Sequence, residues 1–209
     1  MNFLRFPFLI ACMLGTLGLS AQNNQNVGLY VTLNGGLSLP TGQFADTDPE
    51  NGGYANPSAA GLAGIGIKLS QHLAIGAHAA VFNSPVDDGA TIFPNDNPWK
   101  STFLLATVTG TLPLGELASA DAAIMAGPAF VRFPAGDVEI GGVTIGREAE
   151  TGTGLGVGGR IGINYHLDEF ISFRLGATYL SADPSFEQGE TFDQRIATFI
   201  PHLGLTFTL

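Results

Sequence analysis

Apolar residues alternate with polar or small residues along most of the chain beyond its N-terminal region. A period of two is typical of β-strands that present one apolar and one polar face. The alternation continues to the end of the sequence, where Leu205, Phe207 and Leu209 are apolar. Only the stretch LASADAAIMA (117–126) is also compatible with a helix. The pattern predicts eight strands, at residues 28–39, 59–69, 73–83, 101–112, 120–132, 154–166, 171–181 and 195–209.

The connections between these segments are alternately short and long. Three short connections, SQH, PLGELAS and LDEF, alternate with four long ones at residues 40–58, 84–100, 133–153 and 182–194. The long connections contain 14 of the 18 acidic residues. Transmembrane β-barrels have this arrangement, with short periplasmic turns and long outer loops. A soluble sandwich has no reason to order its loops by length in this way.

The two faces of the segments favour a membrane barrel over a soluble one. In segment 154–166, large apolar residues alternate with glycines, Arg160 and Asn164. The interior of a closed eight-stranded barrel is just wide enough for side chains, so small and polar residues suit it. The apolar face then suits lipid, whereas a soluble barrel would have its faces inverted. We therefore predict an all-β fold, an eight-stranded antiparallel up-and-down transmembrane β-barrel.

The polar faces predict what the barrel interior contains. The lumen-facing candidates are Lys68, His78, Asp121, Arg160, Asn164, Arg174 and His202. Because isolated charges are expensive to desolvate, we expect a hydrated cationic interior. Its charge would be balanced by water, by acidic loop residues, or by Asp121, Asn34, Asn164 and Tyr30. Two interpretations remain open: a polar plug that holds the shape of the barrel, and a weak path for small anions.

Aromatic residues on the apolar face lie near both ends of the predicted strands. Tyr165, Phe173 and Phe207 lie near the short turns, and Phe130 and Tyr179 lie near the long loops. Two girdles of aromatic residues flank the apolar band of a membrane barrel, one at each bilayer interface. These five residues therefore support insertion into a bilayer.

The N-terminus is predicted to be a secretory signal peptide. Arg5 lies in a short basic segment, an apolar run follows at residues 6–19, and Ser20 and Ala21 provide the small residues of a cleavage site. The apolar run is shorter than the roughly 20 residues that a membrane-spanning helix needs. We expect a signal peptide at residues 1–21, cleaved after Ala21, and one barrel domain at residues 22–209.

Cys12 has two interpretations. The stretch LIAC (9–12) resembles the lipobox of bacterial lipoproteins, in which the cysteine becomes the lipidated first residue. The residues that follow Cys12 are still apolar, however, so we favour its removal with the signal peptide. The mature chain would then contain no cysteine, which excludes disulfides and thiol catalysis.

Composition and short motifs argue against several classes of function. Charged residues make up 12% of the chain, and a formal net charge of −10 argues against nucleic acid as a partner. GLGVGG (154–159) matches a dinucleotide fingerprint but lies within an alternating segment, not between a strand and a helix. The acidic clusters DTDPE (46–50) and VDDG (86–89) lack the spacing of an EF-hand and are interpreted as solvated loop charge. No cofactor or metal site is predicted.

Two stretches resemble those of a known family. The first strand with its exit, GLYVTLNGGLSLPTGQFAD (28–46), and the ending HLGLTFTL (202–209) are similar to the small eight-stranded outer-membrane β-barrels of Gram-negative bacteria, the OmpX-like and OmpA-barrel-like group. The resemblance implies an outer-membrane location, outer-membrane lipid as surroundings and the barrel-assembly machinery as a partner. It also implies a C-terminal assembly signal, formed by His202, Gly204, Phe207 and Leu209, with Leu209 in place of the usual aromatic residue.

Three functions are compatible with such a barrel. The first is a structural or surface-interaction role, in which the long acidic loops meet a ligand or another protein. The second is a narrow path for small solutes, either small anions or hydrophobic molecules. The third is a hydrolase at the outer rim, which needs a base, usually His, near the long loops. We expect no enzyme, because no long loop contains any of the four histidines, His72, His78, His166 and His202.

Overall fold

The structure is a computed structural model that describes residues 28–48, 52–87, 97–140, 143–147, 149–188 and 190–209. The predicted signal peptide (1–21), which includes Cys12, lies outside the described residues. Parts of the two acidic clusters, residues 49–50 and 88–89, also lie outside them. No helix in the described ranges is long and apolar enough to cross a membrane.

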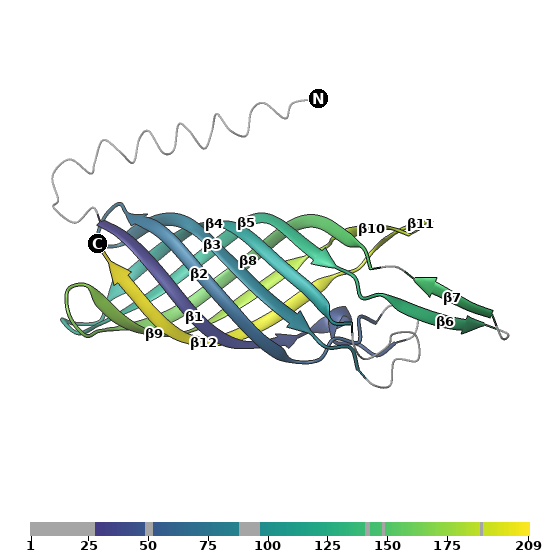
Figure 1. Ribbon diagram of the computed structural model, residues 1–209. Helices are drawn as coiled ribbons and strands as arrows, with labels where there is room; N and C mark the ends of the chain where they lie inside the picture. Colours follow the sequence, from purple (N-terminus) through teal and green to yellow (C-terminus); the bar gives the residue numbers. More distant parts are fainter. Residues whose placement is uncertain (1–27, 49–51, 88–96, 141–142, 148, 189) are drawn as a thin grey trace, which may run out of the picture.

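Eight long strands of the described chain form a closed antiparallel barrel (Figure 1). Each barrel strand pairs with the next barrel strand along the chain, and the first pairs with the last to close the ring. The predicted up-and-down meander is confirmed. The barrel strands are β1 (Gly28–Pro40), β2 (Ser58–Lys68), β3 (Leu73–Ser84), β4 (Trp99–Pro113), β5 (Ala118–Arg132), β8 (Thr151–His166), β9 (Ile171–Ala182) and β12 (Ile196–Thr208).

The bounds of the barrel strands agree with the alternation pattern to within three residues. The stretch LASADAAIMA is not helical, because β5 begins at Ala118 and runs through it. The strands are 11 to 16 residues long. At a rise of about 3.3 Å per residue and a tilt of about 40°, strands of this length extend roughly 28–40 Å across a bilayer. Each strand is therefore long enough to cross the apolar layer.

A ladder of backbone pairs joins the first and last strands. Tyr30 pairs with Thr208, Pro40 pairs with Thr198, and the backbone N–H of Leu209 donates to the Leu29 carbonyl oxygen at 2.8 Å. Lipid offers no hydrogen bonds to backbone groups, so an open edge would cost several kcal/mol for each unpaired group. The alternation that continues to the end of the sequence therefore serves to close the barrel.

The long connections contain regular structure that the alternation pattern did not predict. A 3-10 helix, η2, spans Gly42–Phe44. Strand β6 (Gly136–Ile140) pairs with β7 (Val143–Arg147), and β10 (Ser185–Gln188) pairs with β11 (Glu190–Asp193). Both hairpins extend beyond the barrel at the end opposite the C-terminus (Figure 1). These described elements therefore lie at the long-loop end of the barrel.

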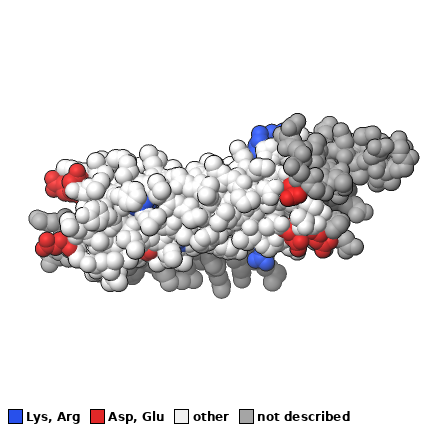
Figure 2. Space-filling view, turned by 90° about the horizontal axis from the view of Figure 1, so that it is seen from below, with Lys and Arg blue, Asp and Glu red and all other residues white. Residues whose placement is uncertain are grey.

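The outward face of the barrel is a large apolar surface. Ile124, Leu155, Ile161 and Leu203 point outward, and each is more than half exposed. In the view of Figure 2 the middle of the barrel is almost free of charge, and acidic residues gather toward both ends. Soluble monomers rarely expose an apolar patch of more than a few hundred Å². This belt is therefore the surface that faces lipid.

Candidate functional site

The barrel interior consists of two halves with different chemistry. Polar and charged side chains line the half near the short turns, and buried apolar side chains fill the half near the long loops. His78 and His202, each 3% exposed, lie between the two halves. The polar and charged residues expected inside the barrel therefore line only the half near the short turns, and the half near the long loops is apolar.

Apolar side chains close the interior on the long-loop side. Phe82, Phe103, Leu105, Leu180 and Ile200 point inward from the barrel strands, and none is more than 2% exposed. The rings of Phe82 and Phe103 are stacked with their centroids 6.0 Å apart. Protein cores of this kind pack as densely as organic crystals. These side chains therefore obstruct the interior in this half of the described barrel.

An aromatic cap, formed by Phe44, Trp99, Phe133 and Phe186, covers the end of this apolar core. Measured between ring centroids, Trp99 is 4.8 Å from Phe133 and 5.6 Å from Phe44, and Phe133 is 5.6 Å from Phe186. All three pairs meet edge to face, a favourable geometry for aromatic rings. Trp99 Nε1 also donates a 2.8 Å hydrogen bond to the Gly53 carbonyl oxygen. Phe44, Phe133 and Phe186 come from three of the long connections, and Trp99 is the first residue of β4, so the cap ties these loops to the barrel.

The aromatic cap is not predicted by the alternation pattern, although the sequence of β4 contains a usable signal. Trp99, Ser101, Phe103 and Leu105 lie on the same inward face of β4, so the phase of the alternation places large apolar side chains inside. Phe186 offers no such signal, because it lies in a loop outside the predicted strands. Its burial depends on packing against the other loops, which a local pattern does not predict.

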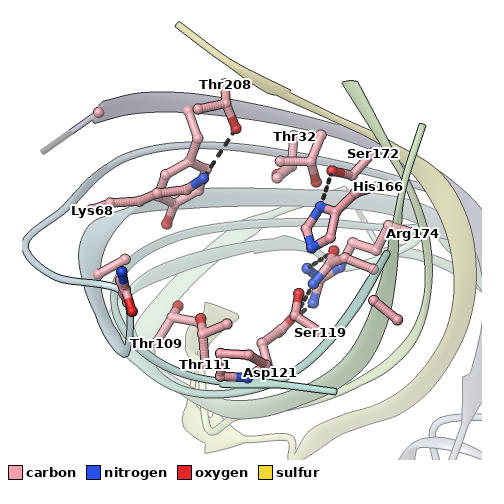
Figure 3. A pocket seen from close by; sticks show the side chains of 18 of the residues that line it. Thr32, Lys68, Thr109, Thr111, Ser119, Asp121, His166, Ser172, Arg174 and Thr208 are labelled. Atoms are coloured by element: carbon pink, nitrogen blue, oxygen red, sulfur yellow. Dashed lines mark hydrogen bonds and ion pairs between the residues drawn. The ribbon is translucent and has the colours of Figure 1, made fainter. Parts of the chain in front are cut away.

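A cavity of about 450 Å³ occupies the half of the interior near the short turns (Figure 3). All eight barrel strands contribute to its wall, with Tyr30 and Thr32 of β1 among the lining residues. Ser70 and Gln71 of the β2–β3 turn and Glu116 of the β4–β5 turn also line it. The cavity therefore opens at the short-turn end of the barrel, and the apolar core closes its inner end.

Asp121 organises the charged side of this cavity. Its carboxylate accepts hydrogen bonds from Arg174 Nη2 at 2.6 Å and from Asn164 Nδ2 at 2.7 Å (Figure 3 shows Asp121 and Arg174). Arg174 Nη1 donates to Asn164 Oδ1 at 3.0 Å, which closes the three side chains into a ring. Arg160 Nε lies 3.8 Å from Asp121 Oδ1, too far for a hydrogen bond. One buried carboxylate therefore serves two buried guanidinium groups.

The other lumen candidates lie outside this network. Lys68 is half-buried in the cavity wall and donates a 3.1 Å hydrogen bond to Thr208 Oγ1 (Figure 3). His202 Nε2 lies 3.1 Å from Thr178 Oγ1. Neither ring nitrogen of His78 has a hydrogen-bond partner within the described chain. The structure brings four of the seven candidates together and leaves these three apart.

Asn34 and Tyr30 were expected to help balance the interior charge. Both side chains point inward, with 8% and 9% of each residue exposed. The side-chain amide nitrogen and oxygen of Asn34 have no hydrogen-bond partner among the described residues. The structure therefore places Asn34 inside the barrel but not in the network around Asp121.

The five aromatic girdle candidates lie on the outward face of the barrel. Phe130, Tyr165, Phe173 and Tyr179 are between 38% and 50% exposed, and Phe207 is half-buried. Tyr165 and Phe173 are register partners beside the β8–β9 turn, so they lie at the short-turn end. Their contact with the bilayer interface stays a prediction.

The four residues of the predicted assembly signal take different positions around the end of β12. His202 points into the barrel, Phe207 lies on the outward face, and Leu209 follows the strand and is 73% exposed. Gly204 lies against β1, where a Cβ would collide with the Leu33 carbonyl oxygen. The recognition of these residues by an assembly machinery stays a prediction.

The two remaining histidines lie near the short turns. His72 Nδ1 is 3.1 Å from the Thr111 carbonyl oxygen, and His166 Nδ1 is 2.8 Å from Ser172 Oγ. Within the described ranges, no group of three or more His, Cys, Asp or Glu residues is placed to hold a metal ion. The described histidines therefore provide no base at the long-loop rim.

No protein-family model matches the chain, and no curated protein sequence matches it. Among solved structures, the chain is similar to the crystal structure of neisserial surface protein A (NspA), with a TM-score of 0.57, 10% sequence identity, and coverage of 86% of this chain and 96% of that chain. It is also similar to the crystal structure of the outer membrane protein OprG from Pseudomonas aeruginosa, with a TM-score of 0.56, 12% identity, and coverage of 90% and 98%. Together with the apolar outward belt, these likenesses show that the chain has the fold of the small eight-stranded outer-membrane β-barrels.

Proposed function

We propose that the protein is an outer-membrane barrel with a closed interior, and that its role is structural or lies in surface interaction through its long acidic loops. The observation that carries this proposal is the aromatic cap above an apolar core. Because the cap closes the interior at the long-loop end, the loops are the part available to molecules outside the cell. They hold 14 of the 18 acidic residues, so a cationic ligand or protein surface is the favoured partner.

The polar cavity supports a second candidate function, a narrow path for small solutes. A path for small anions would use the cavity with Arg160 and Arg174, and would then need the apolar core to open. A path for hydrophobic molecules would require Trp99 and the other rings of the cap to move away from one another. Both routes require movement of densely packed side chains, so this function ranks below the first.

An outer-rim hydrolase is the candidate with least support. Acid–base chemistry at the rim needs a base close to the scissile bond. The described histidines lie inside the barrel or near the short turns. An acidic dyad in the long loops is the only route left to this activity.

A surface-binding experiment tests the proposed function. Cells that display the protein are expected to retain beads coated with a cationic polymer better than cells that lack it. Neutralising Asp137, Glu139, Glu148 and Glu150 of the third long loop with Asn or Gln should lower this retention. The matched control neutralises Glu116, Asp168 and Glu169, which belong to short turns on the other side of the membrane. Equal retention by all strains would contradict the proposal.

Conductance of the purified protein in a planar bilayer separates the first two functions. We expect no ion conductance from the wild type, because the apolar core interrupts the interior. A steady conductance would support the path for small solutes instead. In that case Arg160→Glu combined with Arg174→Glu should reverse any preference for anions, since these two side chains supply the buried positive charge.

A further inference from the structure

The polar cavity contains a buried cation that the protein itself does not fully neutralise. Arg160, Arg174 and Asp121 are only 5%, 3% and 7% exposed. Asp121 is engaged by Arg174 Nη2 at 2.6 Å and by Asn164 Nδ2 at 2.7 Å. Arg160 is left with a 3.8 Å approach to Asp121, and its Nε has no hydrogen-bond partner within the described chain. These three ionised groups leave one positive charge in excess.

Charges at the rim of the cavity do not remove this excess. Lys68 and Glu116 also line the cavity; Lys68 is half-buried and Glu116 is exposed to solvent in the β4–β5 turn. Their opposite charges offset each other. A carboxylate in solvent is also screened, so it stabilises a buried guanidinium group only weakly. The interior therefore keeps its surplus positive charge.

Unpaired hydroxyl groups line the same cavity. Thr32 Oγ1, Thr109 Oγ1 and Thr206 Oγ1 are buried oxygen atoms with no hydrogen-bond partner among the described residues. They come from β1, β4 and β12, and all three residues are part of the cavity wall. A hydroxyl group can donate one hydrogen bond, so rotation of these side chains toward the cavity would bring donors from three strands to a bound molecule.

We propose that this cavity binds a small oxyanion (phosphate, sulfate or a carboxylate) with Arg160 as its main anchor. A guanidinium group matches the geometry of an oxyanion, and hydrogen bonds between charged partners are roughly twice as strong as neutral ones. Low-dielectric walls concentrate the field of a buried charge and raise the local concentration of counter-ions. The oxyanion supplies the missing negative charge and accepts the free hydroxyl donors, whereas water supplies only hydrogen bonds.

The dimensions of the cavity fit this ligand class. A volume of about 450 Å³ corresponds to roughly fifteen water molecules at about 30 Å³ each. A phosphate ion fits in this space together with part of its hydration shell. The apolar core closes the inner end, so the ion enters and leaves at the short-turn end. The site is therefore a binding pocket on the periplasmic side and not a path, and it does not depend on the role of the loops.

Calorimetric titration of inorganic phosphate into the protein, purified in a non-ionic detergent at constant ionic strength, tests this proposal. We expect saturable binding to the wild type, with sulfate as a competitor. Arg160→Gln should weaken the affinity at least tenfold, since it removes the anchoring charge. This variant is expected to fold, because it removes a buried cation that lacks a full partner. Lys100→Gln is the matched control, since Lys100 is an exposed cation on the outward face of β4 and should leave binding unchanged.

A second variant and a second measurement guard against a folding defect in Arg160→Gln. Thr109→Val removes one hydroxyl donor without a change in charge and should weaken phosphate binding severalfold. Phosphate should also raise the unfolding midpoint of the wild type above its value in chloride, because a ligand that binds only the folded state stabilises it. Absence of saturable binding of phosphate, sulfate and acetate to the folded wild type would overturn the proposal. Equal affinity in Arg160→Gln, or an equal loss in Lys100→Gln, would place the binding elsewhere and overturn it as well.

Discussion

Two glycines in the β1–β12 ladder lie next to each other in space but have different surroundings. Gly204 pairs with Asn34, and a Cβ at Gly204 would collide with the Leu33 carbonyl oxygen and lie 2.6 Å from the Asn34 Cα atom. Gly35 pairs with Leu203 and is exposed, and a Cβ there would meet nothing within 4 Å. At the scale of the residue, an added methyl group therefore collides with β1 at Gly204 but meets open space at Gly35, although both lie in the same ladder.

Gly204→Ala is expected to destabilise the barrel by about 1–3 kcal/mol, the usual cost of overpacking. The backbone of β1 would have to move away from β12 to make room for the methyl group. Gly35→Ala is the matched control and should change the free energy of unfolding by less than about 0.5 kcal/mol, as exposed substitutions usually do. Urea unfolding in lipid vesicles measures both values. Equal stabilities of the two variants would argue against the close approach at Gly204.

The residue scale also explains the asymmetry of the charged network. Asp121 can neutralise one guanidinium group fully, and the short contacts of Arg174 show which one it is. Arg160 remains at 3.8 Å. A buried charge without a good partner costs several kcal/mol, and the polar wall of the cavity beside Arg160 lowers that cost. The incomplete neutralisation of Arg160 therefore favours a bound anion in the cavity beside it.

At the scale of the element, β12 combines three environments in one strand. His202 points into the barrel, Phe207 lies on the lipid-facing side, and both edges of the strand are paired, one to β1 and the other to β9. The strand must therefore satisfy the interior, the lipid and two neighbours at once. This requirement explains the regular alternation of residues along β12.

Phe207→Asp is expected to prevent stable insertion of the barrel. A charge on the lipid face costs up to about 2–4 kcal/mol, depending on its depth in the bilayer. The level of heat-modifiable barrel in isolated membranes measures the effect. Phe207→Leu keeps the site apolar and serves as the control, which should insert normally. A normal level of barrel for Phe207→Asp would contradict both the lipid-facing position and the role of this strand in assembly.

The aromatic cap packs residues of different long loops against one another. Phe44, Phe133 and Phe186 come from three different connections, and their rings meet around Trp99 at the start of β4. A loop without such an anchor would have only its own backbone turns to hold it. The cap therefore anchors the loops that contain the hairpins β6–β7 and β10–β11 to the end of the barrel. It also closes the interior at this end.

At the scale of the whole molecule, the chain has three zones along the barrel axis. The long loops lie at one end, an apolar belt almost free of charge lies in the middle, and the short turns with the mouth of the cavity lie at the other end. Acidic residues gather toward both ends (Figure 2). This distribution matches a bilayer with water on both sides. It also assigns the two proposed interactions to different sides of the membrane, the loop partner outside and the small oxyanion in the periplasm.

Cell fractionation is expected to place the protein in the outer membrane, with a gel mobility that depends on heating. Protease added to intact cells should cleave within the long loops, because they lie outside. It should spare the short turn at Asp168 and Glu169, which faces the periplasm, unless the outer membrane is first made permeable. Recovery of the protein in the soluble periplasmic fraction would contradict the membrane-facing belt.

The sequence by itself determined the positions of the barrel strands, their facing and the sides on which long and short connections lie. The reason is that contact with lipid restricts the polarity of each outward residue independently of its distant neighbours. Outward positions within the apolar layer of the bilayer must be apolar, so strands such as β8 show their environment in a period of two. The same local rule identified Asp121, Arg160, Asn164 and Arg174 as inward-facing residues, because polar side chains have no place on the lipid side.

Only the tertiary structure decided what the inward-facing residues do. Asp121, Asn164 and Arg174 come from β5, β8 and β9, and their hydrogen bonds depend on the register of three strands in a closed ring. Phe44 and Phe186 enter the interior from loops that follow no alternating pattern. Contacts inside a barrel depend on strand register and loop packing across long distances in the sequence. For this reason the division into a polar cavity and an apolar, capped half followed from the fold and not from the pattern.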